Sequence, residues 1–293
     1  MELFANWQAS LDFTLKTYYT LLAALQNQGY AFQTLADFLQ RPGERVVVLR
    51  HDVEKRYENA LQFASMQHKL GIRGSYYFRI LNGKFQREII ARVADMGHEI
   101  GYHYDDLSHC RGDHAQAIRR FERHLAMLRE IAPVQTICME GAPLSNHDNR
   151  DLWKHYNYRD YGIIGEPYFE VDFSKVLYLT DTGRRWDGDR FSIRDRVSTS
   201  PRRTEPPVRA KNLSPPRTAH TGEIRFAPTR YQSTHQIITA ANNGSLPNQI
   251  LFTFHPQRWT SKPMPWLQEL VWQNVKNVVK AYRVRKQKKR MKK

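Results

Sequence analysis

The chain has 293 residues, 41% of them hydrophobic, which is enough for one large domain or two small ones. The sequence contains no apolar stretch near the ~20 residues that span a bilayer, no signal-peptide pattern at its start, and only two cysteines, Cys110 and Cys138. These features argue against a membrane-spanning protein, a secreted protein and a disulfide framework. They predict a cytoplasmic protein, either free or peripheral to the inner membrane.

The formal net charge of +16 is concentrated in two segments of the chain. Residues 280–293 contain nine Lys or Arg and no acid, and residues 198–230 contain seven Lys or Arg and two Glu. Such segments bind nucleic acid or anionic lipid, or serve only as solvated chain. Because the rest of the sequence is nearly neutral, we expect no basic domain face, and nucleic-acid binding is the least favoured of the functions considered below.

Helical and strand patterns alternate along most of the chain. In chain order they predict a helix over 11–26, a strand over 45–50, a helix over 57–69, a strand over 75–79, a helix over 87–96, a strand over 99–102, a helix over 113–131, a strand over 136–139, a short helix over 149–156, a strand over 176–180, a helix over 234–242, a strand over 250–254 and a helix over 266–282. This alternation is typical of a parallel sheet with right-handed crossovers.

We therefore expect an α/β fold, a distorted and incomplete (β/α) barrel. A doubly wound open sheet is the alternative, but no Gly-rich phosphate loop follows the first strand. One domain is expected over residues 1–282, interrupted by a flexible Pro/Arg-rich insertion at 198–230 and followed by a disordered basic tail at 283–293. The insertion is either a lid or an inert loop.

Ionisable residues follow three of the predicted strands, and the carboxyl ends of barrel strands converge on one face. Asp52 and Glu54 follow the first strand and, being two apart, point to the same side. Such a pair offers a hard metal ligand and a base for an attacking water, or else caps the following helix.

His103 and His255 each stand at the end of a later predicted strand. His103 is followed closely by Asp105, Asp106 and His109, a combination that suits a divalent metal. His255 precedes Pro256 and is placed to protonate a leaving group, unless it is a core or surface residue.

Further residues near these strand ends suit substrate contact. Glycine and proline permit close approach after the fourth strand, and arginine beside tryptophan suits an anionic sugar, although a salt-bridged surface turn would look the same. The candidate substrate-binding residues are His51, Gly141, Pro143, Arg184, Arg185, Trp186, Arg258 and Trp259.

Taken together, these motifs resemble the NodB-homology polysaccharide deacetylases, in particular a divergent branch found with bacterial surface-polysaccharide genes. The resemblance rests on residues 50–54, 97–103 and 254–259, with a further similar stretch from 161 to 186, and it covers about residues 45–282. It implies a barrel that removes acetyl groups from N-acetyl sugars with a divalent metal, commonly zinc. By motif, Asp52 resembles the base, Glu54 or Asp52 a metal carboxylate, His103 a metal ligand and His255 the acid.

The sequence departs from that family pattern at three positions. Val53 separates two carboxylates that are usually adjacent, Leu107 stands where a second metal histidine is usual, and Glu140 stands near a position where the branch tends to have His. Either Asp106 or His109 completes the metal set, or the site binds metal weakly or not at all.

Three functions remain open from the sequence. The first is a metal-dependent deacetylase acting on a surface-polysaccharide precursor. The second is a catalytically weak relative that binds glycan or scaffolds polysaccharide-assembly proteins. The third is a nucleic-acid-binding protein that depends on the basic segments.

Overall fold

The computed structural model describes residues 11–81, 83–142, 145–186 and 231–290, with the backbone alone over 277–290. Its centre is a seven-stranded sheet in which every pairing is parallel. The strands are β1 (Ala31–Gln33), β2 (Val46–Val53), β3 (Ser75–Phe78), β4 (Glu99–Tyr104), β5 (Val134–Met139), β6 (Leu177–Thr180) and β7 (Gln249–Phe254). Their order is β5-β4-β3-β2-β7-β6, with β1 beside β2.

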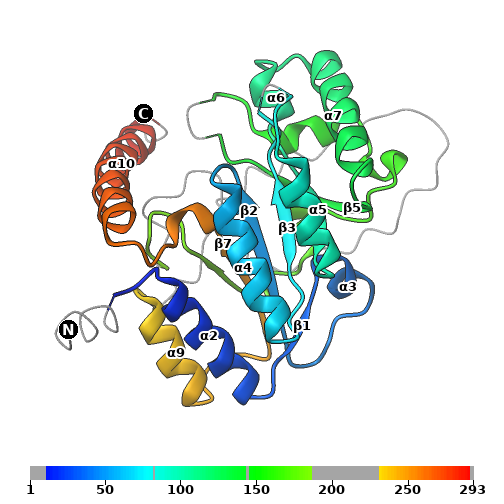
Figure 1. Cartoon of the computed structure of the whole chain (residues 1–293). Helices are drawn as coiled ribbons and strands as arrows, with labels where there is room; N and C mark the ends of the chain where they lie inside the picture. The colour runs from blue at the N-terminus through cyan, green and yellow to red at the C-terminus, as the bar shows by residue number, and fades with distance from the viewer. Residues whose placement is uncertain (1–10, 82, 143–144, 187–230, 291–293) are drawn as a thin grey trace.

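Helices lie between and after the strands, and the longer ones between strands cover the outer face of the sheet (Figure 1). They are α2 (Leu15–Asn27), α3 (Leu35–Gln40), α4 (Tyr57–Lys69), α5 (Arg87–Asp95), α6 (Asp106–His109), α7 (His114–Arg129), α8 (Pro167–Glu170), α9 (Thr234–Asn242) and α10 (Pro263–Arg290), with 3-10 turns η1 (Asn149–Lys154), η2 (Tyr158–Tyr161) and η4 (Pro256–Arg258). Because β5 and β6 are the two edges and do not pair in the described chain, the barrel stays open. The predicted distorted, incomplete barrel is confirmed.

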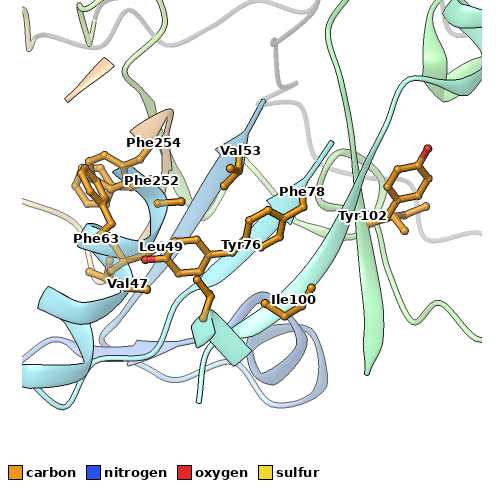
Figure 2. Packing of buried hydrophobic residues seen from close by; sticks show 14 of the residues in the cluster. Val47, Leu49, Val53, Phe63, Tyr76, Phe78, Ile100, Tyr102, Phe252 and Phe254 are labelled. Carbon is orange, nitrogen blue, oxygen red and sulfur yellow. The ribbon is translucent and has the colours of Figure 1, made fainter. Parts of the chain in front are cut away.

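The two faces of β2 serve different purposes. All eight of its residues are buried, as is usual for a strand covered on both sides. Val47, Leu49 and Val53 pack outward against the helices, together with side chains of β3, β4 and β7 (Figure 2). Val46 and Val48 belong to a second, inner apolar cluster that also contains Leu251. Since side chains alternate along a strand, Arg50 and Asp52 continue the inner face.

The structure adds elements that the sequence patterns did not predict. β1 has three residues and α3 six, so neither is long enough for a clear periodicity. A capping box between Thr34 and Asp37 marks the start of α3 and was a usable signal.

The predicted basic tail differs from the structure, and the predicted insertion could not be compared with it. α10 continues to Arg290, so the backbone of the predicted disordered tail is helical up to that residue. The predicted insertion at 198–230 lies outside the described residues. None of the described helices combines the length and the apolar character required to cross a bilayer.

Candidate active site

The inner face of β2 ends in a buried ion pair. Arg50 donates from Nε to Asp52 Oδ1 at 2.8 Å and from Nη2 to Asp52 Oδ2 at 2.6 Å. Arg50 also donates to the Tyr168 hydroxyl at 3.2 Å, which holds the guanidinium in place. Burial by itself would raise the pKa of Asp52, but the charges of Arg50 and His103 outweigh it and lower that pKa. Asp52 is therefore held as a carboxylate.

His103 lies opposite Asp52 at the end of β4. Its Nδ1 is 3.0 Å from the Cys138 carbonyl oxygen, so Nδ1 carries a proton and donates it to that carbonyl. Its Nε2 then faces the site, 3.2 Å from Glu140 Oε2 and 3.9 Å from Asp52 Oδ2. Metal-binding histidines commonly donate one ring N–H to a carbonyl or carboxylate and direct the other ring nitrogen at the metal. His103 has this arrangement, with Nδ1 on the carbonyl and Nε2 toward the site.

Glu140 has a buried oxygen that requires a positive partner. Glu140 Oε2 is buried, and His103 Nε2 is 3.2 Å away. If Nε2 of His103 were unprotonated, two lone pairs would oppose each other at 3.2 Å. A proton or a metal ion must therefore lie between these two atoms.

The donor atoms around His103 are close enough to share one ion. Glu54, His103 and Glu140 each offer a ligand atom within 4.8 Å of the others, and so do Asp52, His103 and Cys138. Two carboxylates and an imidazole are ligands that zinc and other divalent ions accept. The residues present thus fit a divalent metal, with Glu140 as a ligand that the sequence had not assigned.

Without a metal, charge pairing dominates this cluster. Burial would lower the pKa of His103, but Asp52 and Glu140 outweigh it and raise that pKa to about 9. Burial would raise the pKa of Glu140, but the hydrogen bond and charge of His103 lower it. The imidazolium and the carboxylates can therefore neutralise one another.

His255 forms the other side of the site, directly after β7. Its Nδ1 lies 2.5 Å from Asp181 Oδ1, and its backbone N–H donates to Asp181 Oδ2 at 2.9 Å. Arg258 donates to Asp181 Oδ1 at 3.0 Å, and the indole N–H of Trp259 donates to Oδ2 at 2.7 Å. Burial would raise the pKa of Asp181, but His255 and Arg258 lower it. The charged Asp181 therefore orients His255 and leaves its Nε2 directed elsewhere.

Glu54 connects the two sides of the site. Its Oε1 is 3.8 Å from His255 Nε2, and its carboxylate also belongs to the cluster with His103 and Glu140. With 27% of its side chain exposed, Glu54 is more accessible than Asp52, His103 or His255. Glu54 is therefore the side chain of the cluster that is most open to solvent.

Arg79, at the end of β3, ties the site to the neighbouring helices. It binds Asp105 Oδ2 through Nε at 2.9 Å and through Nη2 at 2.6 Å, and its Nη1 is 3.8 Å from Glu140 Oε2. Asp105 in turn binds Arg120 of α7 at 2.6 Å. Because Asp105 holds Arg79, and Arg79 lies near Glu140, this series of ion pairs restricts the movement of Glu140.

Two of the predicted site residues lie elsewhere. His51 is fully buried on the outer face of β2, bonded to Tyr18 and the Ser75 carbonyl, so its predicted substrate contact is wrong. Because side chains alternate along a strand, His51 points to the face opposite to that of Arg50 and Asp52. Asp106 is fully buried in α6.

Asp106 does not join the metal cluster. Its carboxylate accepts hydrogen bonds from the Tyr102 hydroxyl and from Arg120, on the α7 side of the sheet. Burial raises the pKa of Asp106 to about 7, although Arg120 opposes this. Among the described residues, Glu140 rather than Asp106 stands beside His103.

The predicted arginine and tryptophan contacts with substrate are also corrected. Trp186 and Trp259 are 1% and 0% exposed and pack in the aromatic core, because flat rings are needed there to fill the space around Phe254. Arg184 is buried beside the rings of Phe13 and Trp266.

The remaining predicted substrate residues have mixed outcomes. Arg258 positions Asp181, as described above, and therefore acts behind His255. Arg185 is half-buried, and Gly141 follows Glu140 with open space around its α-carbon. Pro143 lies outside the described residues.

Four site residues were absent from the sequence-based set. Arg79, Glu140 and Asp181 each directly follow a strand, and Arg50 lies within β2, at the end of the strand predicted over 45–50. The strand-end rule that selected Asp52 and His255 applies to these residues equally well. Applied to every predicted strand, that rule would have found them.

No family model matches this chain, and no curated protein matches it significantly. Two solved structures are similar over most of their length. One is the Xyl-CE4 domain of a multidomain xylanase from the hindgut metagenome of Trinervitermes trinervoides, with 9% identity, a TM-score of 0.36, and coverage of 78% of this chain and 82% of that one. The other is a Streptococcus mutans CE4 esterase, with 14% identity, a TM-score of 0.40, and coverage of 89% and 91%. The function is therefore inferred from the site itself.

Proposed function

We propose that this chain is a metal-dependent hydrolase that deacetylates an N-acetyl sugar of a surface-polysaccharide precursor. The observation that carries the proposal is the 3.2 Å approach of buried Glu140 Oε2 to His103 Nε2, on the face where Glu54 and His255 also meet. Such a set combines metal ligands with two separate groups for proton transfer. The motif resemblance to polysaccharide deacetylases supports the choice of an N-acetyl sugar.

The residues divide into three roles in this proposal. Glu54, His103 and Glu140 hold a divalent metal, proposed to be zinc. When bound, the metal supplies Lewis acidity toward the acetyl carbonyl and the attacking water. Asp52, kept ionised by Arg50, accepts a proton from that water. His255, oriented by Asp181, delivers a proton to the departing sugar amine.

One observation favours a second candidate, a glycan-binding protein with little or no catalysis. Leu107, at the position where the resemblance expects a second metal histidine, is 2% exposed and belongs to the hydrophobic core. The ion pairs of His103 with Glu140 and Asp52 also satisfy the cluster without a metal. In that case the protein would bind carbohydrate or polysaccharide-assembly proteins without releasing acetate.

Elemental analysis after incubation with zinc and a chelator-free wash separates the two candidates. The hydrolase predicts about one equivalent of metal in the wild type and its loss in His103→Ala and in Glu140→Gln, because each removes one of the three proposed ligands. His109→Ala is the matched control, since His109 is exposed and outside the cluster.

Acetate release is then measured to connect metal binding with activity. Acetate release from N-acetylglucosamine oligosaccharides should require the metal and disappear in Asp52→Asn. A wild type that holds no metal but still binds these oligosaccharides would support the glycan-binding candidate instead.

A further inference from the structure

The helix α10 has its polarity reversed relative to an ordinary surface helix. Its buried positions include Glu269 and Gln273, which are 3% and 5% exposed and bonded to each other at 2.7 Å. Arg56 reaches Glu269 at 3.9 Å from the body of the protein. A helix on a globular protein normally turns its apolar stripe inward and its polar face to water.

The outward face of α10 is apolar. Of the seven large hydrophobic side chains that are exposed in the described part of the chain, five are on this helix. These five, here called the α10 apolar face, are Met264, Leu267, Val271, Trp272 and Val275, with exposed fractions from 49% to 66%. Their spacing of three and four residues places them along one side of the helix. A contiguous apolar face of this kind marks an interaction surface.

The sequence that follows this face is strongly basic. The helix backbone continues to Arg290, and residues 280–293 contain nine Lys or Arg and no acid. The rest of the chain outside 198–230 is nearly neutral, so most of this charge lies on the helical stretch up to Arg290 and not on the domain. A helix with a Trp-containing apolar face and many basic residues is the kind that lies in the interface of an anionic bilayer.

The position of α10 allows such binding. Figure 1 shows the helix at the side of the molecule, away from the helices that cover the sheet. Its first turns are fastened to the body, because Trp266 donates to the Asp12 carbonyl at 2.8 Å and Arg184 donates to the Trp266 carbonyl at 3.0 Å. The apolar face is thereby held outward by the contacts of the opposite face.

We propose that α10 binds the surface of an anionic phospholipid bilayer, with its apolar face in the headgroup region and its basic continuation on the lipid phosphates. The apolar face supplies burial of hydrophobic area, and the basic run supplies the preference for anionic lipid. A bilayer fits better than a nucleic acid because the exposed side chains of 264–275 are predominantly apolar. α10 begins five residues after Arg258, so binding also holds the end of the sheet that carries His255 close to the lipid surface.

Vesicle co-sedimentation of the full chain tests this proposal. We expect binding to phosphatidylcholine vesicles containing about one third phosphatidylglycerol, at least about tenfold weaker binding to phosphatidylcholine alone, and weakening by salt. Leu267→Ser with Val271→Ser should lower binding at least about tenfold, as should Gln at 285, 286, 288 and 289. Tyr19→Ser with Leu81→Ser, which removes two exposed apolar side chains elsewhere, should bind as the wild type does.

Four results would overturn the proposal. One is absence of binding to the anionic vesicles, and another is wild-type binding by the Leu267→Ser, Val271→Ser variant. The third is a wild-type dimer in light scattering that becomes a monomer in this variant, together with no binding of the wild type to vesicles. That result would assign the α10 apolar face to a second copy of the chain. Nucleic-acid binding that the apolar variant retains, without vesicle binding, would overturn it as well. A blue shift of tryptophan emission on vesicles that Trp272→Phe removes would place that ring in the lipid.

Discussion

At the scale of single residues, the site depends on two kinds of contact. His103 Nε2 and Glu140 Oε2 face each other at 3.2 Å, an arrangement that suits a bound cation or a shared proton. His255 is instead held from behind, by Asp181 through both its ring and its backbone. The first contact makes a site for an ion, and the second makes a side chain with a fixed direction.

His255→Gln tests the role of the fixed imidazole. Proton donation by a positioned group contributes about 10²–10⁴ in rate, so we expect acetate release to fall by that factor while oligosaccharide binding changes little. The measurements are kcat for acetate release and binding by calorimetry. His109→Gln, at an exposed position, should retain the wild-type kcat. A His255→Gln enzyme with normal kcat would remove His255 from the chemistry.

At the scale of elements, β4 is built around a close approach. A Cβ atom at Gly101 would lie 2.4 Å from two ring carbons of Tyr77 and 3.1 Å from the Thr136 carbonyl oxygen. Tyr77 is fully buried, and its hydroxyl shares a 2.8 Å hydrogen bond with the Thr136 hydroxyl. The glycine therefore lets three neighbouring strands pack two residues before His103.

Gly101→Ala should overpack this region and lower the free energy of unfolding by about 1–3 kcal/mol. Urea denaturation followed by circular dichroism measures the change. Gly141→Ala is the matched control, because a Cβ there meets no atom within 4 Å. Equal stability of the Gly101→Ala and Gly141→Ala proteins would show that the β3–β4 contact is not tight.

The elements themselves were largely predictable. The helices over Tyr57–Lys69 and Thr234–Asn242 have the predicted bounds, since apolar periodicity and a glycine two residues beyond each helix both mark them. α6 was missed because four residues carry no periodic signal. The metal assignment of Asp106 failed at this level, since α6 turns its carboxylate toward Arg120.

At the scale of the whole molecule, burial of neutral histidines makes stability depend on pH. Burial lowers the pKa of His51 to about 3, against its ordinary value of 6.5. Between these values the unfolded chain binds a proton that the folded chain does not, so stability falls as pH decreases from 6.5 toward 3. The pKa values of His98 and His124, lowered by burial to about 4, act in the same direction.

His51→Gln should reduce this dependence. At pH 4.5 the shift at His51 corresponds to about 2–3 kcal/mol of lost stability, which the variant no longer loses on acidification. The measurement is the difference in unfolding free energy between pH 7.5 and pH 4.5. His68→Gln, at an exposed position of α4, should keep the wild-type difference. An unchanged difference in His51→Gln would mean that His51 takes up a proton in the folded state.

The sequence by itself determined the open parallel α/β architecture and four residues that meet in the site. Alternating periodicities define the strands, and parallel strands bring their carboxyl ends to one edge, so Asp52, Glu54, His103 and His255 follow from position alone. Tertiary structure decided the rest. Which side of a strand faces the site separates Asp52 from His51, and packing of the aromatic core withdraws Trp186 and Trp259 from substrate. The partners Glu140 and Asp181 follow the strands paired with those of His103 and His255, and only their distances to these histidines show what they do.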